Sequence, residues 1–321
     1  MKLKIKNIGI IKNAEILFDG LTVIAGKNDS GKSTVGKTLY SLIKSLSHID
    51  ITPKSVFNDC ITDIFKSQIS DDGAIEFIYD NHTFDITIHN NRCEKFDRPA
   101  NYIDNDLGNY SPILVETPFI WSIFSTLKTI NNLEARGTEI DFDVSLFVKD
   151  LHFVLSQKIK MKKSTIKLDI QNIIGGKFVE NSLGSFVFKK DEKDIELINT
   201  AMGIKYFGIL QVLSENNHFY KNQILILDEP EVHLHPSWQL KLAEIIVTLV
   251  KNGMKILVNS HSPYMIEALQ RYAKKATIAN NFYLAEDREI IQDDESLSKI
   301  FEKLSEPFRE FDKMDSEILN G

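Results

Sequence analysis

Two kinds of hydrophobic pattern run through the beginning of the chain. Apolar and polar positions alternate over residues 3–10 and 14–18, which predicts two strands that each expose one face. Leu21 to Ala25 forms a near-continuous apolar run, as in a strand buried on both faces. Residues 33–47 then carry apolar side chains at helical spacing. We therefore expect a strand, a glycine-containing loop and a helix in that order.

A similar order of buried strand and helix returns in the last third of the chain. Residues 223–227 and 255–258 are apolar runs, and a helical pattern follows each of them. A further strand is predicted over 281–285, and a helix over 296–319 that is interrupted at Pro307. Strands that alternate with helices favour an α/β fold around a largely parallel sheet.

The middle of the chain has a less regular pattern. We predict a core formed by residues 1–47 and 192–321, with a C-terminal helical tail, and an inserted region over residues 48–191. A helix over 195–214 is predicted at the return to the core. The pattern within the insertion predicts a hairpin of strands 74–79 and 83–88 closed by Asp80–Asn81, helices over 118–133 and 144–159, and strands over 165–169 and 185–188.

Charge and composition narrow the possible functions. The net charge is −7, and residues 286–321 account for all of it with twelve acidic and five basic residues. This charge argues against a protein that binds nucleic acid through a uniformly basic surface. Binding through a local basic face remains an alternative. The acidic segment is read as a solvated helix face that packs on the body through its apolar side, with partner docking as the alternative. No apolar run reaches the length of a membrane span, no export signal is recognised, and the two cysteines suit a reducing cytoplasm.

Residues 26–33 read Gly-Lys-Asn-Asp-Ser-Gly-Lys-Ser and match the pattern of a phosphate-binding P-loop. Glycines let successive backbone N–H groups approach the phosphates closely. Lys32 is expected to reach the β- and γ-phosphates of ATP, and the Ser33 hydroxyl to ligate Mg²⁺. The alternative is a glycine turn with an exposed lysine. The residues predicted to bind ATP here are Gly26, Lys27, Asn28, Asp29, Ser30, Gly31, Lys32, Ser33 and Thr34.

Two acidic residues directly follow the apolar run at residues 223–227. Asp228 and Glu229 come at the carboxyl end of a predicted parallel strand, where such sheets bind ligands. Asp228 is predicted to hold Mg²⁺ together with Ser33, and Glu229 to orient or deprotonate the attacking water. The alternative is a strand that ends in a solvated acidic turn.

A histidine follows the next buried strand in the same way. His261 comes directly after Ile256 to Ser260, so it is expected at the same sheet edge. An imidazole there can hydrogen-bond the γ-phosphate and respond to its loss. Glu229 and His261 are therefore the predicted catalytic residues, with a structural role for His261 as the alternative.

These three elements together resemble the ABC-type ATPases, an SMC- and OLD-like group of soluble AAA-family ATPases. The stretch Leu227 to Pro236, with Asp-Glu-Pro-Glu and Leu-His-Pro, resembles the soluble branch of bacterial defence, which includes OLD nucleases, Septu ATPases and retron- or PARIS-associated ATPases. Ser260-His261-Ser262-Pro263 also matches that branch. The resemblance implies an ABC-ATPase-like P-loop fold of class α/β, with a mixed-sheet core and an inserted helical and β region.

The resemblance also implies two ATP molecules held between two subunits, each completed by a signature loop of the other. Residues 200–205 are the candidate loop, in which Thr200, Gly203 and Lys205 would meet the partner's nucleotide. The family's signature serine is missing, and Thr200 alone offers a nearby hydroxyl. An ordinary helix start is the alternative. His235 would lie in a loop that contacts the partner, unless His233 and His235 are simple helix-entry residues.

These features favour a homodimeric, Mg²⁺-dependent ATPase that switches a separate effector, a nuclease or toxin, in antiviral defence. About 60 residues follow His261, too few for a nuclease domain of typical size. A DNA-binding ATPase of DNA repair is the first alternative, so nucleic acid remains a candidate partner. A nucleotide-bound scaffold with little hydrolysis is the second, because of the altered signature loop.

Overall fold

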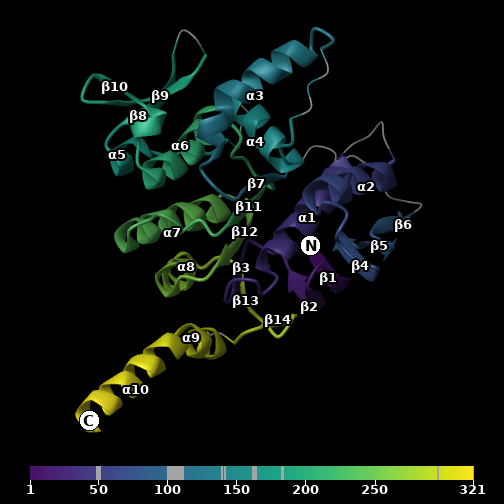
Figure 1. The fold of residues 1–321 in the computed structure, drawn as a ribbon, viewed down its shortest axis with the longest axis vertical. Coiled ribbons are helices and arrows are strands. Elements are labelled where there is room, and N and C mark those ends of the chain that lie inside the picture. The colour runs from purple at the N-terminus through teal and green to yellow at the C-terminus, as the bar shows by residue number, and fades with distance from the viewer. Residues whose placement is uncertain are drawn as a thin grey trace.

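The computed structural model describes residues 1–47, 52–99, 112–138, 140, 142–160, 165–181, 184–294 and 296–320 (Figure 1). The described strands are β1 (Lys2–Ile8), β2 (Ile11–Leu17), β3 (Leu21–Ala25), β4 (Asp72–Tyr79), β5 (His82–His89), β6 (Arg92–Asp97), β7 (Ile113–Val115), β8 (Lys177–Glu180), β9 (Phe186–Lys190), β10 (Lys193–Glu196), β11 (Ile224–Asp228), β12 (Lys255–Ser260), β13 (Asn280–Glu286) and β14 (Glu289–Gln292). The described helices are α1 (Lys32–Ser47), α2 (Pro53–Ile64), α3 (Ile120–Glu134), α4 (Leu146–Ser156), α5 (Gln171–Ile174), α6 (Met202–Glu215), α7 (Pro236–Lys251), α8 (Pro263–Ala276), α9 (Ser298–Leu304) and α10 (Glu306–Asn320), with a 3₁₀ turn η1 (Leu197–Asn199).

Most strands join one large mixed sheet. Its order is β6-β5-β4-β1-β2-β14-β13-β3-β12-β11-β7, and a separate small sheet has the order β10-β9-β8. Strands β13, β3, β12, β11 and β7 run parallel, so their carboxyl ends share one edge. The wing from β6 to β2 is antiparallel. The expected α/β fold with a mixed-sheet core is therefore confirmed.

The parallel strands have mainly apolar centres, since helices cover both faces of this part of the sheet. Leu225 and Leu227 of β11 point into the core formed with α6, α7 and α8. Ile224 and Ile226 alternate with these two leucines along the strand and belong to the second core, which lies under α1 and α2. Figure 1 shows α7 and α8 on one side of these strands and α1 on the other. The continuous apolar runs in the sequence reflect this double burial.

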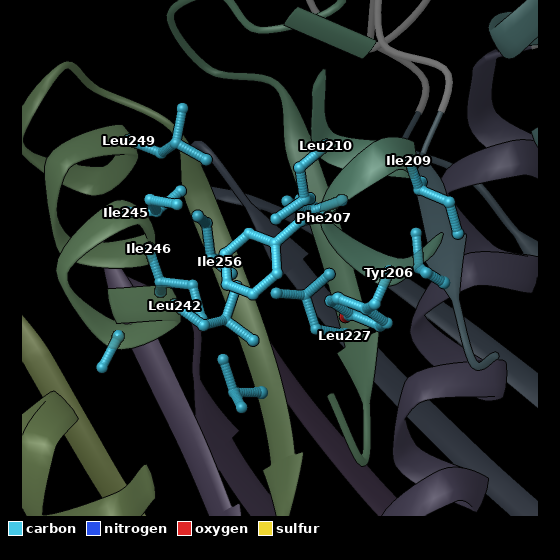
Figure 2. Close-up of a cluster of buried hydrophobic side chains, with 14 of the residues drawn as sticks. Tyr206, Phe207, Ile209, Leu210, Leu227, Leu242, Ile245, Ile246, Leu249 and Ile256 are labelled. Atoms are coloured by element: carbon cyan, nitrogen blue, oxygen red, sulfur yellow. The ribbon is translucent and has the colours of Figure 1, made fainter. Parts of the chain in front are cut away.

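Phe207 of α6 fills the centre of the first of these cores (Figure 2). Its side chain is fully buried, and its ring meets Trp238 edge to face at a centroid distance of 5.4 Å. We expect Phe207→Ala to lower the free energy of unfolding by about 3–5 kcal/mol, because the substitution removes buried contacts and leaves a cavity. Urea denaturation monitored by circular dichroism measures the change. Phe153→Ala on α4, where the ring is 61% exposed, is the control and should shift stability by less than about 0.5 kcal/mol.

The structure corrects several details of the sequence prediction. Residues 165–169 form no strand. The helix predicted over 195–214 starts only at Met202, because β10 and the turn η1 occupy the preceding residues. The break in the C-terminal helix comes at Ser305, so Pro307 stands in the first turn of α10, where a missing N–H costs nothing. The hairpin was predicted correctly, and Asp80 and Asn81 take the left-handed backbone that its turn requires.

Helix α2 and strands β6, β7, β8, β10 and β14 were not predicted from the sequence. Strands β4 and β7 belong to residues 48–191 yet pair with β1 and β11 of the flanking segments. The division into a core and an insertion stays a prediction.

The C-terminal segment packs on the body at its beginning. Leu297 and Ile300 are fully buried, whereas Phe311 on α10 is 56% exposed. Ion pairs with Lys27 and Lys303 hold Glu306 beside the P-loop and lower the pKa of its carboxyl to about 2. In the described parts of the chain, no helix combines the length and hydrophobicity that crossing a membrane requires.

Candidate functional site

The loop between β3 and α1 has the shape that close backbone approach requires. Gly31 has φ of +96°, and a Cβ atom there would lie 2.7 Å from the Ile11 side chain. A Cβ atom on Gly26 would lie 2.6 Å from the carbonyl oxygen of Ala285. Both positions therefore exclude larger residues. Within the loop, Lys27, Asn28 and Asp29 are exposed, and Ser33 and Thr34 are half-buried. The Ser30 hydroxyl oxygen is buried and has no hydrogen-bond partner among the described residues.

Lys32 is folded back inside this loop. Its side chain is 3% exposed, and Nζ donates to the carbonyl oxygens of Gly26 and Lys27 at 2.9 and 2.7 Å. Burial lowers the pKa of the ammonium group, although nearby Glu229 and Asp228 oppose the shift. Burial thus disfavours the charged form of Lys32. A buried positive charge of this kind is suited to binding an anion.

The end of β11 brings two carboxylates to the same place. Glu229 Oε1 lies 3.7 Å from Lys32 Nζ, and the left-handed backbone of Glu229, with φ of 48°, turns the chain at the strand end. Asn259 of β12 donates from Nδ2 to Asp228 Oδ1 at 2.7 Å and to the Lys32 carbonyl at 3.0 Å. Asn259 therefore ties β11, β12 and α1 together. Its place in the Asn-Ser-His run was the only sequence signal for this role.

His261 completes the group from the end of β12. Its Nδ1 atom lies 3.5 Å from Glu229 Oε1 and 3.4 Å from Glu231 Oε1. The side chain is 40% exposed, so the imidazole is open to solvent on part of its surface. The structure thus brings Lys32, Asp228, Glu229 and His261 together at one sheet edge, as the order of the motifs indicated.

A further carboxylate at this edge was not identified from the sequence. Glu116 follows β7, the parallel neighbour of β11, and pairs with Lys37 of α1 at 3.0 Å. Burial raises the pKa of Glu116; the Lys37 charge opposes this shift and the Asp228 charge adds to it. The three-residue strand before it is too short to recognise by periodicity, which explains the omission.

The candidate signature loop lies at the start of α6. Thr200, Gly203 and Lys205 are buried within this chain, and a Cβ atom on Gly203 would lie 3.1 Å from the His233 carbonyl oxygen. The Thr200 hydroxyl donates to the Glu196 carbonyl at 3.2 Å. Ala201 is exposed within the loop, and Ile198 and Asn199, which come just before the loop, are exposed as well. The predicted contacts of Thr200, Gly203 and Lys205 with a partner's nucleotide stay a prediction.

His235 has a clear local role. It is the N-cap of α7, where Nδ1 accepts a hydrogen bond from the Ser237 backbone N–H at 3.3 Å and lies 2.8 Å from the Ser237 hydroxyl. This geometry is that of a helix-entry residue. His233 lies in the preceding loop with a left-handed backbone.

These residues fit ATP and Mg²⁺. The backbone of the glycine loop carries no side chain at Gly26 and Gly31, and two donors lie in it: the Ser30 hydroxyl, which has no partner among the described residues, and the Lys32 ammonium group. Ser33 at the start of α1 and Asp228 at the end of β11 offer oxygen ligands of the kind that Mg²⁺ prefers beside phosphates and water. Among the described residues, no three His, Cys, Asp or Glu side chains form a metal-binding group. A site for Mg²⁺ here would therefore depend on phosphate and water ligands as well.

Family comparison agrees with this arrangement. A family model described as an AAA ATPase domain matches residues 101–266, and one described as an AAA domain matches residues 2–39. The chain is 24% identical over 308 residues to the Septu protein PtuA of Bacillus thuringiensis, which covers 83% of this chain and 72% of the relative. It is also 34% identical over 61 residues to the Old nuclease of Escherichia phage P2, which covers 19% of this chain but only 10% of that nuclease.

Solved structures show the same fold. A crystal structure of the SMC head bound to the C-winged helix domain of ScpA matches with a TM-score of 0.52 at 13% identity, over 91% of this chain and 96% of that one. An SMC head with an extended coiled coil, bound to the C-terminal domain of ScpA from Pyrococcus furiosus, matches with a TM-score of 0.51 at 13% identity, over 95% and 99% of the two chains. The expected ABC-ATPase-like fold is confirmed.

Proposed function

Because the chain belongs to the AAA ATPase domain family, we propose that it binds ATP with Mg²⁺ and hydrolyses it to switch a separate effector in antiviral defence. The observation that carries this proposal is the convergence of Lys32, Asp228, Glu229 and His261 at one sheet edge, with Glu229 Oε1 3.7 Å from Lys32 Nζ and 3.5 Å from His261 Nδ1. The similarity to a Septu protein and to a phage Old nuclease supports the defence setting.

In this proposal each side chain has a distinct task. The loop from Gly26 to Thr34 holds the phosphates, and Lys32 neutralises their charge. Ser33 and Asp228 would hold Mg²⁺, which when bound offsets the charge that develops on the transferred phosphoryl group. Glu229 accepts a proton from the attacking water. His261 donates a hydrogen bond toward the γ-phosphate and so distinguishes the state before hydrolysis from the state after it.

Apolar side chains around the same edge support an ATP-bound homodimer. Phe119, Val232 and Tyr264 each stand four residues beyond the carboxyl end of a parallel strand, and they are 53%, 39% and 60% exposed. Ile198, just before the candidate signature loop, is 88% exposed. Large apolar side chains that a folded chain leaves exposed near one site are a common feature of protein interfaces. We propose that a second copy of the chain covers these side chains and presents the candidate signature loop at residues 200–205, with Ile198 just before it.

Light scattering of the purified chain tests this interface. We expect Glu229→Gln with Mg²⁺ and ATP to elute as a dimer, since slowed hydrolysis keeps the nucleotide in place, and to elute as a monomer without ATP. Adding Ile198→Glu should weaken dimer formation by about 10-fold or more, because a charge at an interface core must be desolvated. Phe153→Glu, at another exposed apolar position on α4 that is 61% exposed, is the control. A monomer with saturating ATP, or equal effects of the two changes, would contradict the dimer.

A nucleotide-bound scaffold with little hydrolysis is the second candidate. It is favoured by the absence of a serine from residues 200–205 and by the engagement of the Thr200 hydroxyl with the Glu196 carbonyl. Both candidates place the protein in the cytoplasm, which the free, buried thiols of Cys60 and Cys93 support.

A further inference from the structure

Glu231 is a buried acid that the ATPase chemistry described above does not use. Its side chain is 3% exposed, although the residue lies only two positions after Glu229. Its Oε1 atom accepts three hydrogen bonds, from the Ser260 hydroxyl at 2.7 Å and from the backbone N–H groups of His261 at 2.8 Å and Ser262 at 3.2 Å. A buried carboxylate is costly unless hydrogen bonds of this kind compensate it.

All three donors belong to one turn, between the end of β12 and the start of α8. Ser262 is the N-cap of α8, and its hydroxyl donates to Gln239 Oε1 on α7 at 2.6 Å. The turn is therefore anchored on two sides, by Glu231 from the β11 loop and by Gln239 from α7. His261 lies between the two anchored residues, so the position of its backbone depends on them.

The same carboxylate also lies near the helix that begins at the candidate signature loop. The Tyr206 hydroxyl on α6 is buried, and neither it nor Glu231 Oε2 has a hydrogen-bond partner among the described residues. Burial, with added contributions from the charges of Glu231 and Asp228, raises the pKa of Tyr206. Glu231 is thus placed where the β11 loop, the β12–α8 turn and α6 meet.

We propose that Glu231 is a positioning residue, whose carboxylate holds the turn at residues 260–262 so that His261 faces Glu229. This inference rests on the proposed ATPase function for its effect on turnover. The structural part does not depend on turnover: the carboxylate, which lies in the loop after β11, accepts hydrogen bonds from two backbone amides and one hydroxyl of the β12–α8 turn. Because His261 touches Glu231 and Glu229 alike at 3.4 and 3.5 Å, a small displacement of the turn separates the histidine from the catalytic carboxylate.

Two readouts on the full-length chain test the proposal. In Glu231→Ala, we expect the amides of His261 and Ser262 to exchange hydrogen for deuterium about 10-fold faster or more, while core amides keep their protection. We expect kcat to fall by about 10- to 100-fold and the dissociation constant for ATP to change by less than about 3-fold, because the P-loop is untouched. Glu231→Gln keeps an oxygen acceptor in place and should restore most of both values.

The control is Glu267→Ala on α8, whose half-buried side chain is 45% exposed and pairs with Arg271, and it should change neither readout. Unchanged exchange at residues 261 and 262 in Glu231→Ala would overturn the proposal. So would faster exchange with undiminished turnover, or a Gln variant as impaired as the Ala variant. If the wild-type chain hydrolyses no ATP, the proposed function fails, whereas the exchange measurement still decides whether Glu231 holds the turn.

Discussion

Replacing Glu229 by glutamine should lower kcat for ATP hydrolysis by about 10²- to 10⁴-fold and leave ATP binding nearly unchanged, since this is the range for loss of a general base. Glutamine has the size of glutamate but cannot accept the proton of the attacking water. The structure places Glu229 next to Lys32 and His261 and leaves its side chain 31% exposed, so that water can reach it. Phosphate release and fluorescent-nucleotide binding, measured on the same preparation, separate the two effects.

Glu244→Gln is the matched control for that change. Glu244 lies on α7, is 52% exposed and pairs with Lys241 at 3.4 Å, away from the strand ends. It should leave kcat within about 2-fold of wild type, as expected for a surface substitution. Equal turnover in Glu229→Gln and wild type would show that Glu229 is not the base. If the wild-type rate is itself near zero while ATP binds tightly, the scaffold candidate replaces the ATPase.

The sequence predicted the parts of this site that local rules determine. Glycine spacing in a P-loop is fixed by the backbone itself, so Gly26 and Gly31 are readable without any tertiary information. Asp228 and His261 follow apolar runs that are too continuous for a surface strand, and parallel strands share a carboxyl edge. The shared edge is why three motifs separated by about 200 residues could be expected to meet.

The missing parts depend on tertiary contacts that no local pattern records. Glu116 follows a three-residue strand whose partner β11 lies more than 100 residues later. In the sequence, Glu231 resembles an ordinary acidic residue of a turn. The fold buries it against the Ser260–Ser262 backbone. The helix predicted from residue 195 begins at Met202 because Ile195 pairs with Phe188 in a small sheet. This strand pairing outweighs the helical spacing of the apolar residues.

Lys32→Met should weaken the stabilisation of the protein by ATP strongly without destabilising the unliganded chain. Methionine keeps the apolar stem and removes the charge. Burial lowers the pKa of Lys32, so the folded chain holds the charged form at a cost that methionine does not have. With ATP, by contrast, truncating one partner of a buried charge pair costs about 2–5 kcal/mol, which is a loss of about 30-fold or more in affinity.

Thermal unfolding with and without Mg²⁺ and ATP measures both the stability of the unliganded chain and its stabilisation by ATP. The wild-type midpoint should rise with ATP concentration, because a ligand that binds only the folded state stabilises it by mass action. The Lys32→Met midpoint should start no lower than that of wild type, and it should need an ATP concentration about 30-fold higher or more for the same rise. Lys241→Met, at a lysine that is 57% exposed on α7, should behave as wild type in both conditions. A lower unliganded midpoint for Lys32→Met alone would mean that the buried ammonium group, with its two carbonyl acceptors, stabilises the empty loop instead of waiting for phosphate.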